Sequence, residues 1–287
     1  MSSPEAADQL RADLRERWER SAEFWETGNA NFQRASQPVS DWIVQHLHPE
    51  HGGRLLELAG GIGEISVAIA GRLGPGGTIV CSDGAEAMVE AARRRAQQAG
   101  VEPPLIEHRQ IELEWIDAAA ASFDGIACRF GVMLCVDPEA ALREARRVLR
   151  PGGRIALAVW ARADQNLWLS GSALAAIAAG HMERPAPGTP GPFALGSADR
   201  LRELLAAAGF QAIETEPVAI TIEEDSLDAL WERSLESSDA LRDLVAGLTP
   251  AEHYRLRDAV DEIWAPFTSD DGSVAIPGLA LCATAEA

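Results

Sequence analysis

A glycine-rich turn and a carboxylate after the next apolar run are the residues of this chain whose spacing could bind a ligand. Residues 55–63 read LLELAGGIG, an apolar strand with the acid Glu57 near its end, followed by a turn and a helix that starts at Glu64. Glycines without a Cβ let the backbone of such a turn approach a ligand closely. A second apolar run, TIVCSD, ends at Asp83 about twenty residues past the turn, where a carboxylate commonly takes two ribose hydroxyls. The pattern predicts a nucleoside-containing cofactor.

The acidic residues on either side of the turn help to distinguish a nicotinamide cofactor from S-adenosylmethionine. Residues 61–66 match GxGxx loosely, so a nicotinamide cofactor must be considered, although one such match is weak. Glu57 stands before the turn, and Glu64 occupies the helix start where a phosphate would use the helix dipole. Two acids suit a pyrophosphate poorly. They suit the aminocarboxypropyl sulfonium of S-adenosylmethionine.

Five segments together resemble a known family. LLELAGGIGE, VCSDGAEAM, RQIELE, CRFGVML and REARRVLRPGGRIALAV, in this order and spacing, resemble class I S-adenosylmethionine-dependent methyltransferases. The nearest resemblance is to the group that includes the ubiquinone/menaquinone-biosynthesis C-methyltransferases. It covers residues 40–160, and the order of the later elements also fits.

The resemblance implies a set of cofactor-binding residues. Glu57 and the glycine turn would hold the methionine end with its amino group, Asp83 would hold the ribose, and Met88 and Glu112 would lie near the adenine. The structural alternatives are a solvated acid for Asp83, helix core for Met88 and a surface charge for Glu112. The residues so assigned are Glu57, Ala59, Gly60, Gly61, Ile62, Gly63, Asp83, Gly84, Met88, Glu112, Leu113, Arg129 and Phe130.

Two of these positions depart from the family pattern. Ala59 replaces the commoner first glycine of the turn. Arg129 stands where a small polar residue is frequent, and its cation could reach the cofactor carboxylate, a substrate anion or a nearby acid.

The methyl acceptor and the catalytic base are less well marked. Histidine suits proton removal near neutral pH. His181, which opens a segment with four prolines and three glycines over 180–192, is the first candidate base, and His253 is the second. A solvated loop histidine remains the alternative reading of His181. We see no metal-binding cluster. The acceptor pocket should draw on the 161–196 segment and on aromatic residues that core packing would also explain: Phe24, Trp25, Phe130, Trp160 and Trp168.

Strands and helices alternate from residue 54 onward. This predicts an α/β, Rossmann-like fold with a seven-stranded, mostly parallel sheet, an antiparallel last strand and helices on both faces. Expected strands are 54–58, 78–83, 105–109, 123–129, 153–160, 211–222 and 273–285. Expected helices are two within the first fifty residues, then 64–73, 84–99, 138–150, 166–179, 197–209, 226–246 and 250–264. The expected parts are an N-terminal helical cap (1–50), a cofactor-binding core (51–160), a substrate loop or lid (161–196) and the rest of the core (197–287) with a helical insertion at 226–265.

Composition excludes several kinds of chemistry. All 25 basic residues are arginines, which removes P-loop phosphate binding, Schiff-base chemistry and the Tyr–Lys pair of short-chain dehydrogenases. A net charge of −19 disfavours nucleic acid and anionic membranes as partners. The four scattered cysteines, the charged N-terminus and the absence of a long apolar run fit a reducing cytoplasm. A homodimer is left open.

The sequence therefore predicts an S-adenosylmethionine-dependent methyltransferase acting on a small, largely apolar or aromatic metabolite, with an O-, N- or C-acceptor. One alternative is a protein of the same fold that binds the cofactor without methyl transfer, as a cyclase or binding module. The other is an NAD-dependent oxidoreductase, which a single tyrosine and the lack of lysine disfavour.

Overall fold

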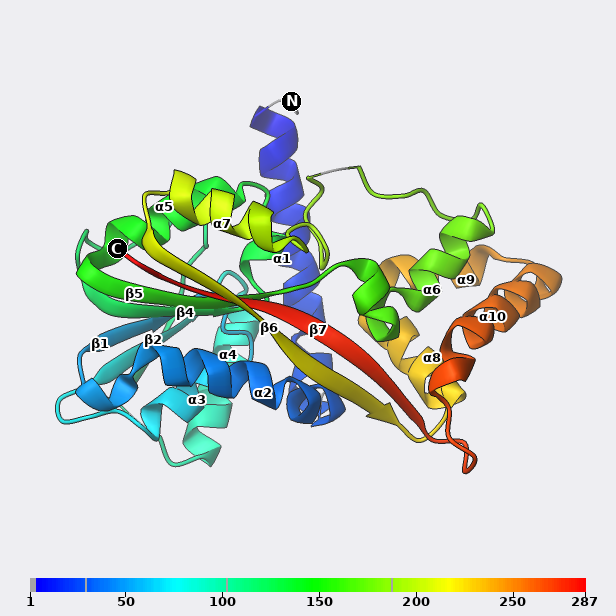
Figure 1. Cartoon of the computed structure of the whole chain (residues 1–287), viewed down its shortest axis with the longest axis horizontal. Coiled ribbons are helices and arrows are strands. Elements are labelled where there is room, and N and C mark those ends of the chain that lie inside the picture. Colours follow the sequence, from blue (N-terminus) through cyan, green and yellow to red (C-terminus); the bar gives the residue numbers. More distant parts are fainter. Residues whose placement is uncertain (1–3, 29, 102, 187) are drawn as a thin grey trace.

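A computed structural model of the chain describes residues 4–28, 30–101, 103–186 and 188–287. Its centre is one seven-stranded sheet in the order β3-β2-β1-β4-β5-β7-β6 (Figure 1). All strand pairs are parallel except those that β7 makes with β5 and β6. The strands are β1 (Arg54–Glu57), β2 (Thr78–Asp83), β3 (Ile106–Gln110), β4 (Phe123–Arg129), β5 (Leu149–Trp160), β6 (Gln211–Glu224) and β7 (Val274–Glu286).

The sheet confirms the predicted fold class, including the antiparallel last strand. That strand does not lie at an edge, because β7 inserts between β5 and β6. The distal halves of β6 and β7 continue beyond Trp160, the last β5 residue paired with β7, as a two-stranded ribbon. The edge strand β6 carries Glu214, Glu216 and Pro217, which discourage pairing with another chain.

Helices cover both faces of the sheet (Figure 1). Helices α2, α3 and α4 pack on one face, and α5 and α7 on the other. The helices are α1 (Pro4–Thr27), α2 (Ala30–Leu47), α3 (Glu64–Ala70), α4 (Glu86–Gln98), α5 (Pro138–Val148), α6 (Leu167–Ala178), α7 (Ala198–Ala207), α8 (Leu227–Ser237), α9 (Asp239–Gly247) and α10 (Pro250–Trp264). In the described residues, no helix combines the length and apolarity needed to cross a bilayer.

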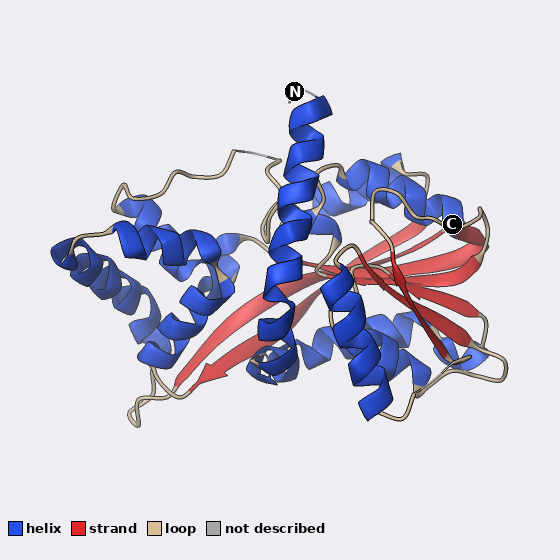
Figure 2. Ribbon diagram, turned by 180° about the vertical axis from the view of Figure 1, so that it is seen from behind, coloured by secondary structure: helices blue, strands red, loops and turns tan. Residues whose placement is uncertain are grey.

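The remaining helices lie at the carboxyl ends of the parallel strands. Helix α1 runs across this edge and packs on α4, with its first turns projecting from the body (Figure 2). Helix α6 packs on α8, α10 and β7, so the expected lid segment and the expected C-terminal insertion form one helical group with α9 (Figures 1 and 2). The ligand side of the sheet is thus enclosed by α1 and this group.

Burial follows the strand pattern. In β1, β4 and β5 the central residues Leu56, Ile126 and Leu157 are fully buried, as expected for parallel strands covered on both faces. Helix α5 begins as predicted, with Asp137 accepting a hydrogen bond from the Ala140 N–H and Pro138 at its first position.

Most helix ends differ from the prediction by a few residues, and two helices differ in a way that has a clear physical reason. Helix α2 runs through Pro38, although an interior proline usually ends or kinks a helix. Its buried stripe, which includes Val39 and Ile43, packs on the sheet and offsets the roughly 3 kcal/mol that an interior proline costs. The helix expected over 226–246 breaks at Ser238, whose hydroxyl accepts the Leu241 N–H and caps α9.

Candidate functional site

The glycine turn between β1 and α3 is held in a left-handed conformation. The φ angles are 50° at Ala59, 53° at Gly61 and 76° at Gly63. The Gly60 N–H donates to the Ser82 carbonyl over 2.8 Å, and the Gly63 N–H donates to the Gly60 carbonyl. A non-glycine residue with positive φ is strained, so Ala59 adopts a backbone conformation that glycine would adopt at lower cost.

The glycines of the turn serve different needs. A Cβ on Gly63 would lie 2.9 Å from the Cβ of Ala92, and one on Gly60 would lie 2.9 Å from the Cδ of Glu57. These two glycines allow the turn to pack. A Cβ on Gly61 would meet nothing within 4 Å. Gly61 therefore presents its backbone to open space, where a ligand could approach it.

Asp83 ties the end of β2 to this turn. One carboxyl oxygen accepts the Gly61 N–H over 2.9 Å, and the other accepts the Ala85 N–H over 3.0 Å. The pKa of Asp83 is raised to about 6, mainly by burial and to a smaller extent by the nearby acids Glu112 and Glu19. The two N–H groups act in the opposite direction, because they favour the carboxylate. Each oxygen retains acceptor capacity, so the group can still take ribose hydroxyls.

Glu57 lies beneath the turn. It is 2% exposed, and its carboxyl accepts hydrogen bonds from the Ser66 N–H (3.0 Å) and the Ser66 hydroxyl. Burial raises its pKa to about 7, partly offset by these bonds and by the charge of Arg129. The predicted contact with the cofactor amino group stays a prediction.

The end of β3 brings Glu112 to the same place. A Cβ on Gly84 would lie 2.9 Å from Glu112 Oε2, so the carboxyl stands over the residue that follows Asp83. Leu113 is half-buried close to the segment after β4. Gln110 pairs with Asp83 in the sheet register and donates to the Gly84 carbonyl, so it also borders the site. The sequence analysis missed Gln110, because the expected strand 105–109 ended one residue before it.

Met88 and Ile62 are buried in a small cluster separate from the main core. Its other fully buried members are Ala22, Ala85 and Ala91, and Trp18 and Trp25 pack against it. Helix α1 thus covers Met88 and Ile62, two of the predicted cofactor residues, with its own apolar face.

Arg129, at the end of β4, pairs with an acid. Its guanidinium donates to Glu64, to the Ser40 hydroxyl (2.7 Å) and to the Ser36 hydroxyl (3.1 Å). Arg129 and Glu64 are 12% and 13% exposed. The sequence left three partners open for Arg129: the cofactor carboxylate, a substrate anion or a nearby acid. In the structure Arg129 pairs with a nearby acid, Glu64.

Phe130 begins an aromatic wall at the strand ends. Its φ is 61°, and its ring stacks on Trp160 with centroids 3.8 Å apart. Phe32 of α2 lies 6.1 Å from both rings and 6.0 Å from the Trp168 ring. A further contact of 5.4 Å joins Phe32 to Trp25. The predicted acceptor aromatics Trp25, Phe130, Trp160 and Trp168 therefore form one cluster, which we call the aromatic wall, around Phe32.

The sequence reading missed Phe32, because nothing distinguishes it from other apolar residues of a helix. Phe24 contacts only Trp25 among the described rings.

The two candidate bases lie in the helical group. His181 follows α6 and lies near Glu252 in the first turn of α10. His253 lies on α10 with its ring 6.1 Å from Trp231, and its buried Nε2 has no hydrogen-bond partner among the described residues. Neither position tests the proposed role, so His181 as base stays a prediction.

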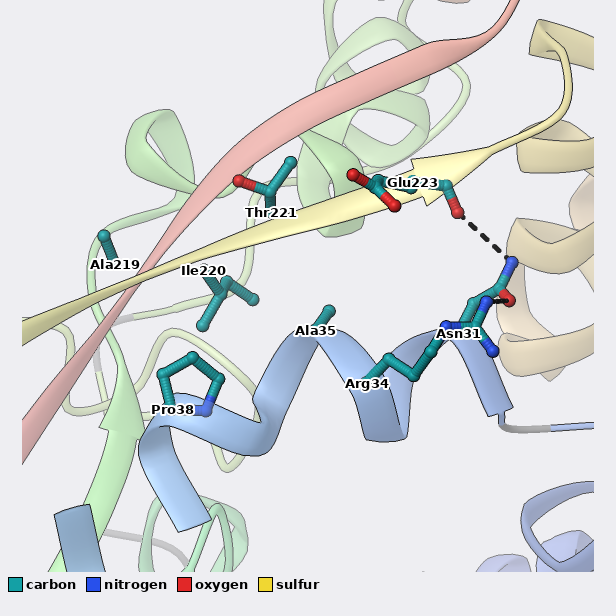
Figure 3. Close-up of a pocket in the computed structure, with 8 residues that line it drawn as sticks. All are labelled: Asn31, Arg34, Ala35, Pro38, Ala219, Ile220, Thr221 and Glu223. Atoms are coloured by element: carbon teal, nitrogen blue, oxygen red, sulfur yellow. Dashed lines mark hydrogen bonds between the residues drawn. The ribbon is translucent and has the colours of Figure 1, made fainter. Parts of the chain in front are cut away.

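A cavity of about 340 Å³ lies elsewhere, between α2 and β6 (Figure 3). Its lining includes Arg34 and Glu223, with Pro38 and Ile220 among the apolar residues. None of the predicted cofactor or acceptor residues borders it. The predicted site therefore does not coincide with this cavity.

The residues at the strand ends fit a cationic nucleoside cofactor. Glu57, Asp83 and Glu112 surround an open glycine turn, and Arg129 is neutralised by Glu64. Such a site favours a sulfonium and an amino group over a pyrophosphate.

Comparison with known sequences agrees with this geometry. Residues 56–157 match a family described as "Methyltransferase domain". The ubiquinone/menaquinone biosynthesis C-methyltransferase UbiE of Roseobacter denitrificans is 36% identical over 126 residues, which are 42% of this chain and 45% of that protein. The chain thus spans less than half the length of this curated relative.

Solved structures share the fold over most of the chain. A phosphoethanolamine N-methyltransferase 2 of Haemonchus contortus, solved with S-adenosyl-L-methionine, superposes with a TM-score of 0.59 at 16% identity and covers 95% of this chain and 60% of that one. The [4+2]-cyclase SpnF gives 0.58 at 20% identity, with coverages of 90% and 84%. At these identities the likeness shows the fold alone, which is that of class I methyltransferases.

Proposed function

We propose that this chain, in which residues 56–157 form a methyltransferase domain of the class I fold, transfers a methyl group from S-adenosylmethionine to a small, largely apolar or aromatic metabolite. Four free cysteines fit our further proposal that it works in a reducing compartment such as the cytoplasm.

One observation carries the proposal: the backbone directly after Phe130 of the aromatic wall passes against the glycine turn. Gly131, directly after Phe130, passes so close to the turn that a Cβ on it would lie 2.4 Å from the Cβ of Ala59. The predicted methionine-binding turn and the predicted acceptor wall are therefore adjacent. Methyl transfer requires such a juxtaposition, because the acceptor atom must lie in line with the methyl carbon and the sulfur.

Each side of the site has a distinct task. Asp83 and Glu112 would hold the nucleoside part, and Glu57 would attract the amino group from beneath the turn. The rings of Phe130 and Trp160 would orient a planar acceptor and exclude water. S-adenosylmethionine supplies an activated methyl group. The acceptor forms its new bond to that carbon while the carbon–sulfur electron pair stays on sulfur, and the acceptor proton passes to a base or to water.

Calorimetric titration with S-adenosylhomocysteine, S-adenosylmethionine and NADH tests the cofactor. We expect the two sulfur compounds to bind and NADH not to bind. Binding of NADH alone would overturn the assignment.

The transfer itself is tested by the release of S-adenosylhomocysteine from S-adenosylmethionine in the presence of reduced naphthoquinones, benzoquinols, phenols and amines in turn. We expect release with at least one aromatic acceptor. Cofactor binding without release for any acceptor would favour a binding or cyclase role.

A further inference from the structure

Helix α1 contacts the predicted cofactor residues through ionic and polar groups. Arg15 Nη1 lies 2.9 Å from Glu112 Oε1, joining residues 97 positions apart in the sequence. One turn further along, the two oxygens of Glu19 accept the N–H groups of Glu86 and Ala87 over 2.8 Å each. Glu19 thereby caps the start of α4, the helix that carries Met88. Two polar contacts therefore anchor α1 to the edge of the site.

Apolar packing sets the same helix in register. Trp18 and Trp25 pack against the small buried cluster of Ala22 with Ile62 and Met88. Trp25 also touches Phe32 of the aromatic wall. The Arg15 side chain is thus carried by a helix whose position against the turn is set by buried contacts.

The charges around Glu112 give Arg15 a specific task. Asp83, Glu112 and Glu19 are close enough that the two glutamates raise the pKa of Asp83. Arg15 is the cation that pairs with Glu112 in the described part of the chain. Without it, Glu112 would be repelled by Asp83 and Glu19 and would turn away toward solvent.

We propose that Arg15 is a positioning residue of the cofactor site, holding the Glu112 carboxylate over Gly84 and beside Asp83 so that it can accept hydrogen bonds from the nucleoside. The inference rests on the proposed function and deepens it, because it adds α1 to the cofactor site. Oε1 is taken by Arg15, and Oε2, which faces Gly84, is left to accept from the ligand.

A merely structural role predicts something different. Arg15 and Glu112 are 48% and 49% exposed, and exposed ion pairs contribute little to folding. Loss of the pair should therefore leave the melting temperature almost unchanged. Arg20 offers a matched control, because it lies on the same helix and is 57% exposed. It pairs with Glu16 at 2.7 Å and with Asp239 at 3.7 Å, and neither partner is a predicted cofactor residue.

The test is a double-mutant cycle for S-adenosylhomocysteine affinity, using the full chain and the variants Arg15→Gln, Glu112→Gln and both together. We expect each single variant to lose about five- to tenfold in affinity and the double variant to lose no more than either, because the two residues act as a unit. Arg15→Lys should recover part of the loss, Arg20→Gln should bind like the unsubstituted chain, and melting temperatures should agree.

Three outcomes would overturn the inference. Additive losses would mean that Arg15 and Glu112 act separately. Tighter binding by Arg15→Gln would mean that the ion pair competes with the cofactor. An equal loss with Arg20→Gln would mean that α1 acts only through the fold. If the unsubstituted chain itself does not bind S-adenosylhomocysteine, the proposed function fails and this inference fails with it, which distinguishes that case from the other three.

Discussion

Arg129, at the carboxyl end of β4, forms a buried ion pair with Glu64 in the first turn of α3. The pair joins the segment that leads into the aromatic wall to the helix that follows the glycine turn. Ser36 and Ser40 of α2 accept hydrogen bonds from Nη1 of Arg129, so three elements meet at one cation. This arrangement holds two sides of the site in a fixed relation and leaves Arg129 little freedom to contact a ligand.

Removal of one partner should destabilise the fold. We expect Arg129→Met to lower the free energy of unfolding by about 3 kcal/mol, because Glu64 would keep a buried charge with only Arg95, at 3.6 Å, as a partner. The double variant Arg129→Met/Glu64→Met should recover most of the loss. Urea unfolding measures both, with Arg20→Met as the exposed control, for which about 1 kcal/mol or less is expected. Equal losses in the single and double variants would show that Arg129 acts through packing alone.

The part of the site that could be predicted is formed by residues that lie close together in the sequence. The strand, glycine turn, helix and following strand lie within one local unit, so Gly61 and Asp83 could be brought together from their spacing. The mostly parallel sheet and its antiparallel last strand followed from the alternation of strands and helices, whereas the position of β7 between β5 and β6 was not predicted.

The contacts made by the N-terminal helices could not be predicted in this way. Arg15 reaches Glu112 across 97 positions, and Arg129 reaches Glu64 across 65. A helical stripe shows that Phe32 and Trp18 face something apolar, but not whether that surface is the core or the aromatic wall. Which of the two surfaces a helix packs against depends on contacts between distant elements, and the periodicity of a single helix does not reveal those contacts.

Gly61 offers a test of ligand approach to the turn, with Gly76 as a matched control. Both glycines have positive φ, 53° and 73°, and both have open space where a Cβ would stand. Alanine at either position should therefore lower the free energy of unfolding by a similar amount, about 1–2 kcal/mol. We expect only Gly61→Ala to weaken S-adenosylhomocysteine binding, by more than about tenfold, because its methyl group would occupy the ligand's space. Equal affinities of the two variants would show that the ligand does not approach Gly61.

Asp83 should make cofactor binding depend on pH. Its pKa of about 6 means that the carboxylate, which we propose accepts two ribose hydroxyls, becomes protonated as the pH falls through that value. Affinity for S-adenosylhomocysteine should therefore rise with pH through about 6 and level off above it. Asp83→Asn should bind weakly and lack this step while keeping any step that belongs to Glu57. Calorimetry between pH 5 and 8 measures both curves, and parallel curves would exclude Asp83 as the titrating group.

Phe32 should affect the acceptor and not the cofactor. It contacts Trp25, Phe130, Trp160 and Trp168, whereas Phe24, the matched control, contacts only Trp25 among the described rings. We expect Phe32→Leu to raise the KM for an aromatic acceptor by about three- to tenfold, from the loss of edge-to-face contacts that order the wall. Affinity for S-adenosylhomocysteine should stay unchanged, and Phe24→Leu should change neither quantity. A loss of cofactor affinity in Phe32→Leu would place this ring in the cofactor site.

Glu57 should stabilise the fold less than its neutral counterpart would. Its pKa is about 7 in the folded chain against an ordinary value of 4.5, so the folded state binds the proton more tightly than the unfolded state does. The stability that this proton confers is complete below pH 4.5 and is lost as the pH rises through about 7, a change of about 3 kcal/mol.

Glu57→Gln keeps an oxygen that can accept from Ser66 but does not ionise, so it should avoid this loss. At pH 8 the variant should unfold with a free energy up to about 3 kcal/mol higher than that of the unsubstituted chain, with the difference shrinking toward pH 5. Its affinity for S-adenosylmethionine should fall, because the carboxylate that would attract the amino group is gone. Urea unfolding and calorimetry at pH 5, 6, 7 and 8 measure the two effects. A stability difference that does not vary with pH would mean that Glu57 is not protonated in the folded chain, and an unchanged affinity would place the cofactor amino group elsewhere.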